Sequence, residues 1–171
     1  MSTYYLISSL PVLNLEQRPS LTREDYLLQC RSQLSATDAD AIEALLFDLS
    51  SSHLFVVAWR DKETSLKNAI AYARATKAHA DVEPWIRPTE GCDTSYEVLV
   101  DEVFQLTDPL QRERGLDKLR WKIAESLQGY DPMDVTVALA YAIKLKLAWR
   151  WANLNVETGL TTFEQLTTID F

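Results

Sequence analysis

The stretch YAIKLKLAWRWANLNVETG, residues 141–159, decides the fold because its apolar residues fall on two sides of a predicted helix. At about 100° per residue, one side collects Tyr141, Ala142, Leu145, Trp149, Ala152 and Val156. The other side collects Ile143, Leu147, Trp151 and Leu154. A surface helix needs a single apolar stripe. Two stripes predict either a central helix of a bundle or a helix that shares one face with a partner.

Cations border both apolar sides of this predicted helix. Lys146 and Arg150 lie with Asn153 on the polar strip between the two sides, and Lys144 lies on the opposite margin. The helix is expected to run from about residue 132 to residue 155, after the turn GYDPMD.

The composition predicts an all-α protein. The 171 residues include 4 glycines and 6 prolines, too few for a turn-rich sandwich or barrel, and helix-forming residues dominate. We expect a multi-helix bundle of about six to seven helices, in which YYLISSLPVL forms a short extended N-terminal arm or a short first helix. The length suits a single domain. A two-lobed arrangement, 1–83 and 93–171 joined by the Pro-rich loop 84–92, is the alternative.

Capping residues predict where several helices begin. Thr22, with Asp25 three residues later, starts one helix as a variant capping box, and Thr37 opens the next. Residues 54–59 are ambiguous, because LFVVAW suits a strand or the opening of a helix.

Two further helix starts are expected in the second half. Asp108 is the N-cap and Pro109 the first residue of a helix that runs to about residue 128. Thr161 with Glu164 is expected to cap a short final helix.

The helix after Pro109 carries a tryptophan on its charged side. Its core stripe comprises Leu116, Leu119, Ile123 and Leu127. Trp121 projects away from that stripe, among Arg114, Asp117, Lys118 and Glu125. A tryptophan in such surroundings is either covered by another element or is an interface anchor. The residues predicted to bind a partner are Trp121, Arg114, Lys118, Lys146 and Arg150.

Charge is distributed unevenly along the chain. The formal net charge is −8, which disfavours a generic nucleic-acid binder. Residues 110–150 hold 8 Lys and Arg against 5 Asp and Glu, a net of +3, so the remainder, 9 against 20, carries −11. This segment indicates a directional electrostatic surface, or else a chance fluctuation over two helices.

No recognised catalytic, cofactor-binding or metal-binding pattern is present in the sequence. His53 and His79 have no neighbours at ligand spacing, and glycine-rich phosphate loops and nucleophile signatures are missing. Cys30 and Cys92 have no metal or redox spacing, which fits a reducing cytosol, and Cys30 is expected to be a buried small hydrophobe. No apolar run approaches the ~18 residues of a membrane span, and the N-terminus lacks the pattern of a signal peptide.

Three parts of the sequence carry a resemblance: YYLISSLPVL, SLKNAIAYARA and the C-terminal LDKLRW…YDPMDVTVALAYAIKLKLAWRW…ETGLTTFEQL. They resemble a small bacterial family of unassigned biochemical function that is encoded in operons for V/A-type ATPases. The best-matched motifs are SLP (9–11), LRW (119–121) and YAIKL (141–145). That family is similar to the socket subunit of these ATPases, which is all-α and non-catalytic and joins the central rotor to the membrane ring. The chain is shorter than a usual socket subunit.

The resemblance implies a non-enzymatic component of a V/A-type ATPase that acts in rotor–ring coupling or in assembly. Its expected partners are central-stalk or membrane-ring subunits, and its expected location is the cytoplasm, with attachment to the inner membrane through the ATPase. The alternative is a free-standing helical adaptor with an unrelated protein partner. An enzyme with an unrecognised site, which would need a deep polar pocket, is a third class.

Overall fold

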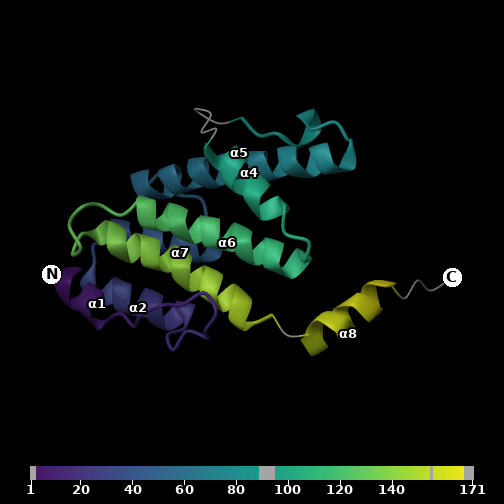
Figure 1. Cartoon of the computed structure of the whole chain (residues 1–171). Coiled ribbons are helices and arrows are strands. Elements are labelled where there is room, and N and C mark those ends of the chain that lie inside the picture. Colours follow the sequence, from purple (N-terminus) through teal and green to yellow (C-terminus); the bar gives the residue numbers. More distant parts are fainter. Residues whose placement is uncertain (1–2, 89–94, 155, 168–171) are drawn as a thin grey trace.

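The structure, a computed structural model, describes residues 3–88, 95–154 and 156–167. This part of the chain contains eight α-helices, one short 3₁₀ helix and no strand (Figure 1). The helices are α1 (Thr3–Ser9), α2 (Arg23–Gln33), α3 (Ala36–Phe47), α4 (Leu54–Ala78), α5 (Ser95–Phe104), α6 (Pro109–Ser126), α7 (Val135–Ala152) and α8 (Val156–Thr167), with η1 (Glu83–Trp85) after α4. The predicted all-α class is confirmed.

Helix α7 is the centre of the bundle. It packs against α3 and α6 and also touches α1 and α2, and Figure 1 shows it running between α6 on one side and α1 and α2 on the other. Every residue of the run 138–143 is buried, so all sides of the helix are covered there. The central-helix interpretation of the two apolar sides is therefore confirmed.

The two tryptophans of α7 form hydrogen bonds on different sides of the bundle. Trp149 Nε1 donates to the carbonyl of Leu21, in the segment before α2, at 2.9 Å. Trp151 Nε1 donates to Asp117 of α6, also at 2.9 Å. Each indole therefore ties α7 to a different neighbour.

The ends of α7 and α8 differ from the predictions. The predicted helix over 132–155 is shorter, because Asp134 caps α7 by accepting the N–H of Thr136 at 2.8 Å, and the helix ends at Ala152. Leu154 consequently lies outside the helix and is exposed. The expected start of the last helix at Thr161 is wrong, since α8 begins at Val156 and Thr161 lies within it.

Local capping explains most other helix starts. Thr22 caps α2 by accepting the N–H of Asp25, and Asp108 caps α6 ahead of Pro109, as predicted. The expected opening of a helix at Thr37 is wrong by one residue, because Ser35 accepts the N–H of Asp38 at 3.2 Å and α3 begins at Ala36.

Two segments with open interpretations are helical. Residues 54–59 form the first turns of α4, capped by the His53 side chain. The segment YYLISSLPVL, residues 4–13, contributes most of α1 (Thr3–Ser9) and then continues without regular structure.

Both halves of the chain contribute to one buried cluster. Leu6 and Ile42 from the first half share it with Val100 and Leu139 from the second half, and α4 packs directly against α5. Residues 89–94, which include the last four positions of the predicted Pro-rich loop 84–92, lie outside the described residues. In the described part, no helix combines the length and the apolarity that crossing a membrane requires.

Candidate functional site

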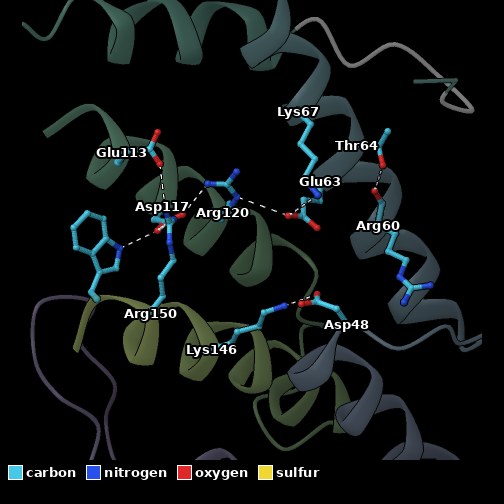
Figure 2. Close-up of polar contacts among 11 residues, drawn as sticks. Asp48, Arg60, Glu63, Thr64, Lys67, Glu113, Asp117, Arg120, Lys146 and Arg150 are labelled. Carbon is cyan, nitrogen blue, oxygen red and sulfur yellow. Dashed lines mark hydrogen bonds and ion pairs between the residues drawn. The ribbon is translucent and has the colours of Figure 1, made fainter. Parts of the chain in front are cut away.

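The carboxylate of Asp117 lies on the face of α6 that meets α7. Its side chain is 0% exposed. Oδ1 accepts a hydrogen bond from Arg120 Nη1 at 2.7 Å, and Oδ2 accepts hydrogen bonds from Trp151 Nε1 and Arg150 Nη1. Figure 2 shows both guanidinium groups turned toward this carboxylate. Both oxygens are therefore occupied by donors, two of them cationic.

Further carboxylates extend this ionic cluster across three helices. Arg150 also pairs with Glu113 of α6 at 3.2 Å, and Arg120 approaches Glu63 of α4 at 3.8 Å. Glu63 pairs in turn with Lys67 at 3.2 Å (Figure 2). Charges of opposite sign alternate from α4 through α6 to α7, so the cluster links the three helices.

The ionic cluster borders a cavity of about 300 Å³ between α3, α4, α6 and α7. Its lining residues are Leu45, Trp59, Glu63, Glu113, Asp117, Arg120, Ile143, Lys146, Leu147 and Arg150. Each of its three cations forms an ion pair with a carboxylate of the same chain. A ligand in this cavity would have to compete with these pairs, so the arrangement favours a structural role for the charges.

The sequence pattern predicted Asp117 on the charged, outward side of the helix, together with Trp121. That placement is wrong, because the buried surface of α6 is wider than the leucine stripe. Ala124 is also fully buried and lies seven residues after Asp117, on the same side. The pattern of Asp117, Arg120 and Ala124 is the signal that could have revealed this second buried face.

The predicted partner-binding cations all lie in intramolecular contacts, and two of them, Arg114 and Arg150, contact the same Trp151 ring. Lys146 pairs with Asp48, in the turn after α3 (Figure 2). Lys118 pairs with Glu16 at 3.6 Å, with both side chains more than half exposed. The Arg114 guanidinium lies 5.1 Å from the centre of the Trp151 ring, which brings Arg114 to the same indole that Asp117 binds.

Trp121 is half-buried and packs against the edge of the core. Its Nε1 donates to Glu125 Oε1 at 2.9 Å, and Lys144 Nζ lies 5.0 Å from the ring centre. Lys144 also pairs with Glu125, at 3.2 Å. A cation from α7 thus covers part of the indole, and the described contacts of Trp121 are separate from those of the four predicted cations.

A second buried polar group joins α2 to α7. Tyr26 donates from its hydroxyl to the carbonyl of Ala138 at 2.7 Å, and its ring lies 5.0 Å from that of Tyr141. Burial raises the pKa of the Cys30 thiol to about 11, although a hydrogen bond with Tyr26 opposes the shift. Burial also raises the pKa of Tyr141 to about 12. Cys30 is completely buried, as predicted, and a raised pKa is the opposite of what a nucleophilic thiol needs.

The part of the chain that the structure describes has no cluster of side chains suited to binding a metal ion. Residues 3–88, 95–154 and 156–167 contain no group of three or more His, Cys, Asp or Glu that could hold a metal. Cys92 lies outside the described residues.

Comparison with known proteins gives one similarity. A family model described as a protein of unknown function (DUF2764) matches residues 95–169. The matched segment spans α5 to α8, less than half of the chain, and includes Asp117 and all five predicted partner-binding residues. The description names no activity and no partner. Comparisons with curated proteins and with solved structures gave no match.

Proposed function

We propose that the chain is a non-catalytic subunit or accessory factor of a bacterial V/A-type ATPase. In this role it contributes to coupling between the central rotor and the membrane ring, or to assembly of the complex. The resemblance of the SLP, LRW and YAIKL motifs to a family encoded in such operons is the reason for naming this complex. The all-helical fold is compatible with a non-catalytic connector.

The observation that carries the proposal is a basic strip on the outer side of α6. Arg114, Lys118 and Lys122 follow one another at intervals of four residues, which places them along one side of the helix. Lys118 and Lys122 are exposed, on a chain whose formal net charge is −8. A local positive surface on an acidic protein orients its approach to an acidic partner surface.

Of the other predicted partner-binding residues, Arg150 and Trp121 are next to the ends of this basic strip, whereas Lys146 pairs with Asp48 apart from it. Arg150 shares the Trp151 ring with Arg114, and Trp121 precedes Lys122 in the chain. In this proposal the strip makes the contact, while the ionic cluster around Asp117 holds α6 in position on the bundle.

Co-purification from the native host tests the proposal. Tagged protein, isolated with its membrane in mild detergent, is expected to bring down the rotor or ring subunits of the ATPase. The double variant Lys118→Glu/Lys122→Glu is expected to lose them. The control is Arg31→Glu/Arg87→Glu, which changes the same charge at exposed positions on α2 and after η1.

Three outcomes are informative. Loss in the α6 variant alone supports the basic strip as the contact. Absence of all ATPase subunits from the wild-type preparation refutes the proposal. Recovery of an unrelated protein would instead favour the free-standing adaptor.

A further inference from the structure

Helix α8 extends away from the bundle beyond the end of α7 (Figure 1). Leu160 and Phe163 are 58% and 64% exposed, and their spacing places them on the same side of the helix. The sequence of α8 contains two glutamates and no lysine or arginine. It is therefore an acidic amphipathic helix whose described apolar residues remain largely uncovered by the bundle.

The complementary surface lies where α4, α5 and α6 meet. A cavity of about 320 Å³ there is lined by the cations Arg74, Lys77 and Arg112, by the carboxylate of Glu113 and by the apolar side chains of Phe104 and Leu116, among others. A neighbouring cavity of about 370 Å³ shares Arg74 and adds Ile70 and Trp85. Trp85 is 71% exposed. The two cavities share Arg74 and Ala78, and their combined lining holds four cations against two carboxylates, Glu113 and Asp81. We call this apolar surface with a net cationic border the α4–α6 groove.

The cations of the α4–α6 groove differ in how far they are already engaged. Arg112 donates two hydrogen bonds to the carbonyl of Leu106 and stacks on Phe104, so it holds the turn between α5 and α6. Arg74 approaches Glu113 at 3.5 Å, with both side chains well exposed. Lys77 is exposed and has no ion pair within the described part of the chain. Lys77 is therefore the cation best placed to meet an incoming carboxylate.

We propose that α8 of one molecule docks in the α4–α6 groove of a second copy, and that the exchange is reciprocal. The apolar pair of α8 matches the apolar floor of the groove, and its acidic side matches the cationic border. Because one chain carries both the helix and a groove of opposite charge, α8 of each copy can occupy the groove of the other, which gives a closed two-fold dimer. An anionic lipid surface suits α8 poorly, because helices that bind such surfaces carry Lys and Arg on the polar side.

Sedimentation of the full-length chain over a range of concentrations tests the dimer directly. The wild type is expected to show a reversible monomer–dimer equilibrium. Phe163→Ser is expected to weaken dimerisation by about tenfold or more, the usual effect of removing an aromatic anchor. Gln165→Ser, on the opposite side of α8, is its matched control and is expected to leave the equilibrium unchanged. A wild type that stays monomeric at all concentrations overturns the proposal.

The groove side is tested with Lys77→Glu, with Arg31→Glu on α2 as the control for charge. Only Lys77→Glu is expected to weaken dimerisation. Circular dichroism of each variant confirms that the fold is retained, and none of the substituted side chains is buried. Equal effects of Lys77→Glu and Arg31→Glu would overturn the role of the groove.

Mixing the two variants distinguishes exchange between copies from folding of α8 onto its own bundle. A pair formed from Phe163→Ser and Lys77→Glu chains retains one intact helix in one intact groove. When one substitution already abolishes the contact in which it lies, the contact that carries both substitutions loses nothing further, so the mixture is expected to associate more strongly than either variant alone. If α8 binds its own groove, mixing restores nothing, and that result overturns the proposal. The dimer uses a different surface from the basic strip, so Lys118→Glu/Lys122→Glu is expected to dimerise normally whatever the outcome with the ATPase.

Discussion

Replacing Asp117 by alanine is expected to destabilise the protein by about 3–5 kcal/mol, the usual cost of removing one partner from a buried ion pair. The substitution removes the acceptor of three hydrogen bonds. Arg150 can recover part of its loss, because its side chain is 45% exposed and retains Glu113. Arg120 cannot do so equally, since it is 15% exposed and its remaining partner Glu63 is 3.8 Å away. The Trp151 N–H also loses its acceptor.

Asp117→Asn separates charge from shape in this position. The amide keeps one oxygen as an acceptor, but it presents an NH₂ group to a guanidinium and removes the negative charge. We expect a loss of about 2 kcal/mol, in the range for a hydrogen bond to a charged group. Glu113→Gln is the matched control, because it also removes a carboxylate from Arg150 but at a half-exposed site. Its expected cost is below about 1 kcal/mol.

Urea unfolding followed by far-UV circular dichroism and tryptophan fluorescence measures the three free energies of unfolding. The expected order of destabilisation is Asp117→Ala, then Asp117→Asn, then Glu113→Gln, with similar m values. If Asp117→Ala costs no more than Glu113→Gln, the ionic cluster does not hold α6 on α7 and the reasoning is refuted.

Three further results are expected from the same unfolding assay. Gly115→Ala should lower the free energy of unfolding by about 1–3 kcal/mol, because a Cβ there would lie 2.8 Å from Val103 Cγ1. Adding Val103→Ala should recover part of the loss. An unchanged or higher stability of Gly115→Ala would contradict the close approach of α5 and α6. Trp121→Ala should cost about 2 kcal/mol, less than for a fully buried tryptophan, and a loss near zero would show that the indole contributes nothing to the bundle. Burial raises the pKa values of Cys30 and Tyr141 to about 11 and about 12, so the unfolded chain releases these protons at lower pH than the folded chain. The free energy of unfolding should therefore fall as pH rises above about 9. Equal stability at about pH 8 and pH 10.5 would contradict this.

Local patterns explain why much of the fold could be predicted from the sequence. A cap depends on a few neighbouring residues, so Thr22 and Asp108 marked their helices correctly. The two apolar sides of α7 likewise follow from the spacing of residues along one helix. They predict that it is central before any partner helix is known.

The candidate site was less predictable because it depends on tertiary contacts. Asp117 looks like a surface residue until α7 brings Arg150 and Trp151 to the same face of α6. The early start of α8 was missed for a different reason: Gly159 and Thr161 resemble a break followed by a cap, but both lie within the helix. A strong local signal is not decisive where neighbouring residues also favour a helix.

The central position of α7 affects how the chain is made. Tyr26 binds Ala138, Leu21 binds Trp149 and Pro11 binds Tyr141, contacts that span 112, 128 and 130 residues. During translation, α2 and α3 leave the ribosome long before α7, which must cover them. The nascent chain therefore carries exposed apolar helices until nearly all of it has been synthesised. We expect the N-terminal half to need a chaperone, or to stay partly folded, until α7 emerges and completes the core.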